Sequence, residues 1–289
     1  MPVLTIRHKT EYRYANPVAF GEHRVMLRPR DGHDLKVIEQ RMTIDPEPVS
    51  LRWIHDVFGN SVGIAKFAGH SDRLVFESEV TIDHNPQQDI DLSQGDDAFF
   101  YPFKYEAEEM PDLRRSIKRQ YADPDRIIED WARQFIKSGE PTRTRDLLTD
   151  VTHAIKRQFA YRGRHHPGVQ TPLETLALGA GTCRDFALFM IEVVRSLGFA
   201  ARFVSGYLHV RRGSGRVGGG NTHAWVQVYL PSAGWVEFDP TNGVVGNHGL
   251  IRVAVAREPR QAVPLCGTFT GSRSDSLGMN VDIDVIAQV

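Results

Sequence analysis

A cysteine, a histidine and an aspartate occur in the order of a nucleophile, its base and the group that orients the base. Cys183 follows Gly181 and Thr182, and the next members of the set are His223 and Asp239. A thiolate attacks carbonyl carbon, an imidazole moves the proton, and a carboxylate fixes the imidazole tautomer. Each of the three residues lies at the end of a strongly patterned segment. The set therefore predicts covalent cysteine catalysis.

The segment after Cys183 predicts a helix that faces the core. Its apolar residues recur at helical spacing, as at Phe186, Met190 and Val194, and Gly198 is a typical residue for the end of the helix. Thr182 is a plausible N-cap, so Cys183 falls in the first turn. The helix dipole and the free N–H groups of that turn favour a thiolate and can stabilise an oxyanion.

His223 and Asp239 fall on a predicted antiparallel hairpin. Residues 223–230 alternate between two faces, Pro231 to Gly234 reads as a turn, and residues 235–239 form a second strand that ends before Pro240. His223 near the start of one strand would then lie beside Asp239 near the end of the other. Taken singly, the three residues would be a buried cysteine, a hydrogen-bonded strand histidine and a turn aspartate. The joint pattern favours a triad.

At these residues the chain resembles the transglutaminase-like superfamily, whose fold is papain-like. The motifs are Gly-x-Cys-Arg-Asp-Phe-Ala at 181–187, Thr-His-Ala-Trp-Val at 222–226 and Gly-Trp-Val-Glu-Phe-Asp-Pro-Thr-Asn at 234–242. The N-terminus resembles the β-rich region that accompanies this core in bacteria, through the stretch from His8 to Val18 and through Leu27-Arg28-Pro29. The resemblance implies Cys183 as nucleophile, His223 as general base and Asp239 as orienter. The superfamily includes transferases, proteases, other amide hydrolases and inactive members.

Other residues are candidates for the cleft. The superfamily uses a side-chain oxyanion donor upstream of the nucleophile, for which Tyr161 and Gln170 are candidates, and Trp225 either packs in the hairpin or borders the acyl site. The Gly-rich stretch from Gly213 to Gly220 lacks a phosphate-binding pattern and is expected to be a mobile loop over the site. Arg162 to His166 is interpreted as a solvated loop, since adjacent histidines give no metal-ligand spacing.

Composition limits the classes of function. The 289 residues carry a net charge of −1, which gives no electrostatic case for nucleic acid or an anionic membrane. The N-terminus lacks the apolar stretch of a signal peptide, and the most apolar segment, 186–204, is interrupted by charges. A disulfide between Cys183 and the second cysteine, Cys266, would block the nucleophile, so a reduced, cytoplasmic protein is expected. No cofactor or metal is expected, and the oligomeric state is open.

The predicted fold class is α+β. Alternating segments dominate residues 1–85 and indicate a β-sandwich-like domain, assigned to 1–105 with its acidic connector. Residues 106–289 are assigned to the papain-like core, in which helices, including the nucleophile helix, pack on an antiparallel sheet. The β-like segments of 250–289 extend the core sheet or pair with the N-terminal domain; the sequence leaves both open.

The expected activity is hydrolysis of a peptide or protein amide through an acyl-thioester on Cys183, as in a cysteine peptidase or amidase. Transfer of the acyl group to an amine, as in a transglutaminase, is the alternative. Hydrolysis is favoured because the chain shows nothing like the calcium sites of cross-linking enzymes and because Gly218 to Thr222 is polar. A non-catalytic peptide-binding module is the alternative from another class, but it would be expected to lack a triad residue.

Overall fold

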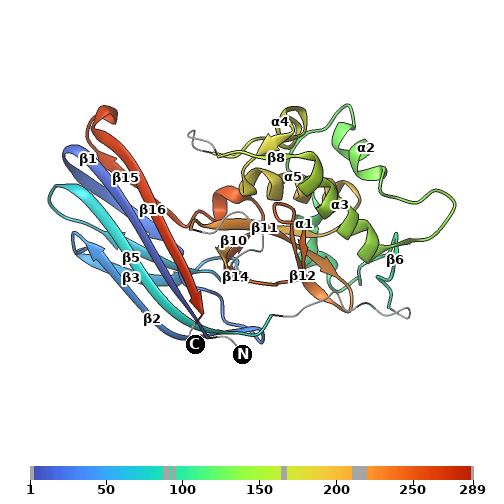
Figure 1. The fold of residues 1–289 in the computed structure, drawn as a ribbon, viewed down its shortest axis with the longest axis horizontal. Helices are drawn as coiled ribbons and strands as arrows, with labels where there is room; N and C mark the ends of the chain where they lie inside the picture. The colour runs from blue at the N-terminus through green and yellow to red at the C-terminus, as the bar shows by residue number, and fades with distance from the viewer. Residues whose placement is uncertain (1–2, 87–91, 93–95, 164–167, 210–219, 288–289) are drawn as a thin grey trace.

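A computed structural model describes residues 3–86, 92, 96–163, 168–209 and 220–287. Figure 1 shows two bodies side by side: a β-rich N-terminal domain, and a core in which helices cover a second sheet. This arrangement confirms the predicted α+β class with a β-rich N-terminal region. Within the described residues no helix is long and apolar enough to cross a membrane.

The N-terminal domain is built around one long strand. Strand β1 (Val3–Val25) alternates buried and exposed side chains along its first half, where it pairs with β5 (Ser71–His84), and β5 in turn pairs with β2 (Leu35–Asp45). The far end of β1 pairs with β4 (Ser61–Lys66), which pairs with β3 (Ser50–His55). The register shifts between Arg13 and Val18, and the two halves enclose an apolar cluster that includes Phe20, Leu27 and Phe76.

The C-terminal segments that the sequence left open divide between the two bodies. Strand β14 (Leu250–Ala256) joins the core sheet, whereas β15 (Leu265–Thr270) and β16 (Ser276–Ala287) pair with β1. The short 3-10 helices η1 (Pro259–Gln261) and η2 (Arg273–Asp275) lie in the connections. In Figure 1 the red C-terminal strands accordingly lie beside the blue N-terminal strand. The first and the last strand of the described chain thus belong to the same sheet.

The core consists of helices packed on an antiparallel sheet. The sheet order is β13-β12-β11-β10-β14, formed by β10 (Ala201–Leu208), β11 (His223–Leu230), β12 (Gly234–Asp239) and β13 (Val244–Val245) with β14. Before the sheet come α1 (Met110–Ile117), α2 (Ile127–Arg133), α3 (Thr144–Gln158), α4 (Pro172–Leu178) and α5 (Cys183–Ser196). Helix α5 is buried on nearly every side, which explains its apolar sequence.

Two short strand pairs tie the helices to their surroundings. Strand β6 (Phe100–Tyr101) pairs with β7 (Thr142–Arg143), so the chain already contacts the core at residue 100. Strand β8 (Ala160–Tyr161) runs parallel to β9 (Ala180–Gly181), which leads directly into α5. This second pair brings the end of α3 beside the start of α5.

Candidate functional site

Cys183 is the first residue of α5. The N-cap Thr182 is extended (φ −90°, ψ 173°), and its backbone N–H and hydroxyl both donate to Asp185 Oδ2, at 2.7 and 2.8 Å. Asp185 Oδ1 accepts the backbone N–H of Gln170 at 2.7 Å. The fully buried Asp185 therefore clamps two approaching segments to the first turn of the helix. A Cβ at Gly181 would lie 2.8 Å from Asp185 Cβ, so this approach requires glycine.

The imidazole of His223 is held by Asp239. Val226 pairs with Phe238 in the β11–β12 hairpin, and beyond this pair His223 Nε2 donates to Asp239 Oδ2 at 2.8 Å. Both side chains are buried. Nε2 of His223 faces the carboxylate, and Nδ1 bonds to no nitrogen or oxygen atom of the described chain. Nδ1 is therefore the ring nitrogen that can exchange a proton with Cys183.

The charges in this cluster act on one another. Burial alone lowers the pKa of His223, but the carboxylate of Asp239 and hydrogen bonding to Asp239 and Cys183 outweigh it and raise the pKa above its usual range. Burial raises the pKa of Asp239, yet His223 and Asn242 lower it overall. Asp239 therefore stays ionised, and the imidazole is stabilised in its protonated form.

The upstream candidates separate clearly. Tyr161, held by the pairing of β8 with β9, lines the cleft with Cys183, and burial together with the neighbouring Cys183 raises the pKa of Tyr161 to about 12. Its hydroxyl stays protonated and is available as a donor. Gln170 Oε1 instead accepts the Thr175 hydroxyl at 3.2 Å, and Gln170 does not line the cleft. Trp225 is fully buried and stacks on His223 with ring centroids 6.0 Å apart, so it is a packing residue.

Sequence reasoning missed the residues that hold Asp239. The backbone N–H groups of Thr241 and Asn242 donate to Asp239 Oδ1 at 2.9 and 3.2 Å, and Asn242 Nδ2 donates to Oδ2 at 2.8 Å. An aspartate that accepts from residues two and three positions later is an Asx-type turn, which Asp-Pro-Thr-Asn favours. That signal was present in the sequence.

Cys183 opens into a cleft of about 730 Å³ between the two bodies. The core contributes Tyr161, Thr182 and Thr222, and the N-terminal domain contributes His8 and Thr10 of β1 and residues of β16. The predicted loop over the site, Gly213–Gly220, lies outside the described residues except for Gly220, and so do Arg164 to His166 of the second predicted loop. Among the described residues no cluster of three histidine, cysteine or carboxylate side chains could hold a metal.

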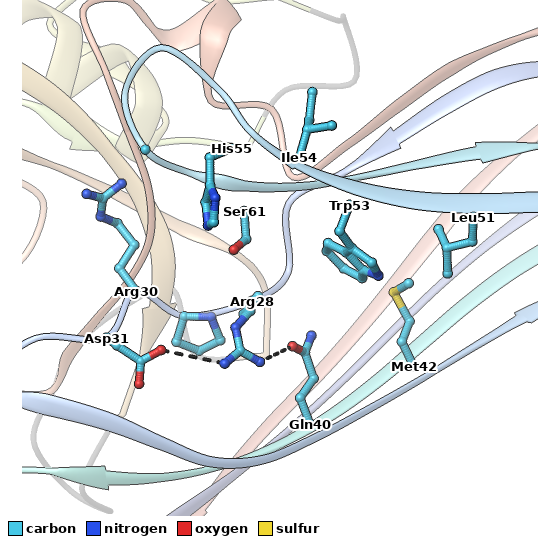
Figure 2. A pocket seen from close by; sticks show the side chains of 12 residues that line it. Arg28, Arg30, Asp31, Gln40, Met42, Leu51, Trp53, Ile54, His55 and Ser61 are labelled. Carbon is cyan, nitrogen blue, oxygen red and sulfur yellow. Dashed lines mark hydrogen bonds and ion pairs between the residues drawn. The ribbon is translucent and has the colours of Figure 1, made fainter.

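A second groove, of about 820 Å³, lies on the N-terminal domain (Figure 2). Its arginines are already bonded: Arg28 donates to Gln40 Oε1 and Arg30 to Asn60 Oδ1, both at 2.8 Å. Figure 2 shows Trp53 and Met42 facing each other beside this polar end. The groove is slightly larger than the cleft, and no cysteine lines it.

Comparisons with known proteins agree with this architecture. The sequence of residues 4–83 matches the family model of the bacterial transglutaminase-like N-terminal region. Residues 129–240 match the family model of the transglutaminase-like superfamily. Uncharacterized proteins of Mycobacterium tuberculosis and Mycobacterium leprae are 28% and 27% identical to the chain. The alignments cover 96% and 98% of this chain and 91% and 99% of those proteins.

A solved structure extends the agreement to the whole fold. The crystal structure of a proposed cysteine protease from Cytophaga hutchinsonii superposes with a TM-score of 0.74 at 18% identity, over 99% of this chain and 90% of that chain. The likeness therefore includes both the N-terminal domain and the core, and at this identity it shows the fold.

Proposed function

Because the chain joins a bacterial transglutaminase-like N-terminal region to a core of the transglutaminase-like superfamily, we propose that it is a cysteine hydrolase of amide bonds. Cys183 is the nucleophile, His223 the general base and acid, and Asp239 the group that orients His223. The observation that carries the proposal is the buried hydrogen bond of 2.8 Å from His223 Nε2 to Asp239 Oδ2, beside a cysteine in the first turn of α5.

The first half-reaction follows from this placement. His223 Nδ1 takes the proton of the Cys183 thiol, and the thiolate forms a C–S bond with the amide carbonyl carbon. The N–H groups at the start of α5 and the Tyr161 hydroxyl stabilise the oxyanion. The C–N bond then breaks as His223 returns the proton to the leaving amine. The product of this half-reaction is an acyl-thioester.

Water resolves the acyl-enzyme in the second half-reaction. His223 removes a proton from water, the hydroxide attacks the thioester carbonyl, and the thiolate leaves and regains its proton. Polar residues near Cys183, namely Thr182, Asn221 and Thr222, line the cleft and give water a favourable path. This polarity supports hydrolysis over transfer to an amine.

The test is to trap and then partition the acyl-enzyme. A peptide library is incubated with the protein, and adducts are mapped by mass spectrometry. We expect the adduct at Cys183, its loss in Cys183→Ser, and its retention in Cys266→Ser. A primary amine is then added with a substrate from the library, and free acid should exceed the new amide. An excess of the amide at modest amine concentration would replace the hydrolase with a transglutaminase. Peptide binding without any adduct would indicate a binding module.

A further inference from the structure

One wall of the cleft comes from the other body of the molecule. The cavity that contains Cys183 is also lined by Met279 and Val281 of β16, by Leu265 at the start of β15, and by Val263 of the connection that leads from the core into β15. We call these four residues the apolar wall. Figure 1 shows β16 as the strand of the N-terminal sheet that lies toward the core.

The register of β16 places its two members of the apolar wall, Met279 and Val281, on the same face of the sheet. Met279, Val281 and Ile283 pair with Tyr12, Thr10 and His8 of β1, so alternation places all three on one face of the sheet. Ile283 is buried and belongs to the same apolar cluster as the helices of the core. Along the same face Val281 is half-buried, and Met279 is 56% exposed. The sheet therefore packs on the core at Ile283 and leaves an apolar face open at Met279.

The connection that completes the apolar wall is fixed beside the nucleophile. Arg184, the neighbour of Cys183, donates to the carbonyl oxygens of Pro259 and Ala262 at 2.7 and 3.5 Å. Met26 N–H donates to the Pro264 carbonyl oxygen at 2.7 Å from the N-terminal domain. Both bodies thus hold this segment, so the apolar wall has a defined position relative to the thiol.

The charged groups of the cleft are paired with one another or with the backbone. The Arg184 guanidinium is occupied as described, and Arg260 Nε lies 2.8 Å from Glu258 Oε2. His8 is buried and bonded to Tyr207 and Thr10, at 2.9 and 2.8 Å. Each charged side chain that lines the cleft therefore already has a partner. A substrate side chain that binds in this cleft is therefore better matched by its lining if it is apolar than if it is charged.

Strand β16 also carries the backbone features of a peptide-binding edge. In the described chain it pairs with β1 on one side and with no strand on the other. A free strand edge presents unpaired N–H and C=O groups that an extended peptide can join, while alternate side chains meet alternate pockets.

We propose, on the basis of the function proposed above, that the substrate is an extended peptide with an apolar side chain next to the reacting carbonyl. That side chain lies against Met279 and Val281 while Cys183 attacks. The N-terminal domain is then the substrate-recognition wall of the enzyme.

Irreversible peptide probes test this proposal without a known substrate. Tripeptidyl acyloxymethyl ketones alkylate a cysteine when its thiolate forms a C–S bond and the carboxylate leaves. A single leucine is placed at each position in turn in a series of otherwise serine-containing probes. The rate of alkylation at Cys183 is measured by mass spectrometry, with iodoacetamide as a probe that needs no recognition. We expect the probe with leucine next to the ketone to react roughly tenfold faster than its serine counterpart, and a preference at another position only would contradict the proposal.

Variants of β16 then test whether Met279 and Val281 cause the leucine preference. Met279→Ser should remove most of the leucine preference, and Val281→Thr, which keeps its shape, should reduce it. The matched control is Leu277→Ser, which changes another exposed apolar residue of β16, two positions from Met279, that does not line the cleft. It should keep the preference, and all variants should react normally with iodoacetamide. The inference is overturned if Met279→Ser keeps the full leucine preference, or if the unmodified protein shows no leucine preference. Either result leaves the proposed function standing. Failure of Cys183 to react even with iodoacetamide overturns the proposed function as well.

Discussion

The imidazole of His223 is fixed on two sides. Asp239 accepts its Nε2–H, and Trp225 stacks on its ring at an interplanar angle of 28°. Asp239 is itself held by two backbone N–H groups and by Asn242 Nδ2. A base that is oriented in this way needs little reorganisation to accept the proton of Cys183.

Truncation of the triad should give graded losses. We expect Cys183→Ala to abolish acyl-enzyme formation and His223→Ala to lower kcat/KM by roughly 10³-fold or more. Asp239→Ala should lower kcat/KM by a smaller factor, because this residue acts only through His223. Steady-state kinetics on a substrate from the library measures all three, and far-UV circular dichroism verifies folding. Substantial activity in His223→Ala would show that the base is misassigned.

The titration of His223 should depend on Asp239. The carboxylate raises the pKa of His223 against the opposing effect of burial, so Asp239→Asn should lower that pKa. The imidazolium would then lose its proton at a lower pH than in the unmodified protein. NMR titration of the ¹⁵N-labelled imidazole gives the two midpoints. Asn242→Ala keeps the carboxylate and should shift the midpoint less. Equal midpoints with and without the carboxylate would contradict the assigned electrostatics.

The sequence indicates the triad residues but not all of their neighbours. Cys183, His223 and Asp239 mark the ends of elements with clear periodicity, so their placement needs only local patterns and one hairpin. Tyr161 reaches the cleft through the pairing of β8 with β9, two-residue strands that leave no periodic signal. The sequence offers Gln170 as a second candidate, but its Oε1 accepts the hydroxyl of Thr175.

At the scale of elements, α5 depends on the buried clamp at its first turn. Asp185 accepts three hydrogen bonds, from Thr182 and from the backbone of Gln170, and it is fully buried. Helix α4 begins with a similar arrangement in which Glu174 accepts from Thr171, but there the accepting carboxylate belongs to an exposed residue. The two helix starts offer a matched comparison.

Asp185→Asn should destabilise the protein more than Glu174→Gln. An amide cannot accept at both of the positions that Asp185 fills, so a buried N–H group loses its partner at a cost of about 1–3 kcal/mol. Water can replace the bonds at Glu174, and the cost there should stay below about 1 kcal/mol. Urea denaturation measures both variants. Equal losses of unfolding free energy in the two variants would show that the buried hydrogen bonds of Asp185 stabilise the protein no more than the bonds of Glu174.

Element boundaries were less predictable than element types. The alternation predicts the first strand for residues 3–14, and β1 continues to Val25 after an irregularity in its register. Helix α2 begins only at Ile127, because Arg126 has a positive φ of 57° and Asp123 accepts the N–H groups of Ile128 and Glu129. Such side-chain contacts decide where helices begin.

Buried polar contacts join the two bodies of the molecule. Arg252 of β14 donates to Glu237 of the core and to Asp34 of the N-terminal domain, at 2.9 and 2.6 Å. Asn60 exchanges two hydrogen bonds with the backbone of Val255. The cleft at Cys183 therefore depends on contacts far apart in the sequence, which is why the sequence alone could not assign the C-terminal strands.

Loss of the Arg252 contact should destabilise the whole molecule. Arg252→Ala leaves two largely buried carboxylates without their cation, which typically costs about 3–5 kcal/mol. The control is Arg41→Ala, which breaks the exposed pair with Glu39 and should cost at most about 1 kcal/mol. Urea denaturation followed by fluorescence and by circular dichroism compares the two. A loss in Arg252→Ala no larger than in Arg41→Ala would mean that this contact does not hold the bodies together.

Competition between the two cysteines for limiting iodoacetamide near pH 7 tests the central claim most directly. If accessibility alone decided, iodoacetamide would label the exposed Cys266 before Cys183, which is 7% exposed. Partial burial of its thiol raises the pKa of Cys266, which makes that thiol less reactive near pH 7. Cys183 is instead the first residue of α5 and the nucleophile of the proposed triad. We expect peptide mapping to find the label first on Cys183, and His223→Ala to slow that site at least tenfold while leaving Cys266 unchanged. Earlier labelling of Cys266, or a Cys183 rate indifferent to His223, would contradict a nucleophile activated by this histidine.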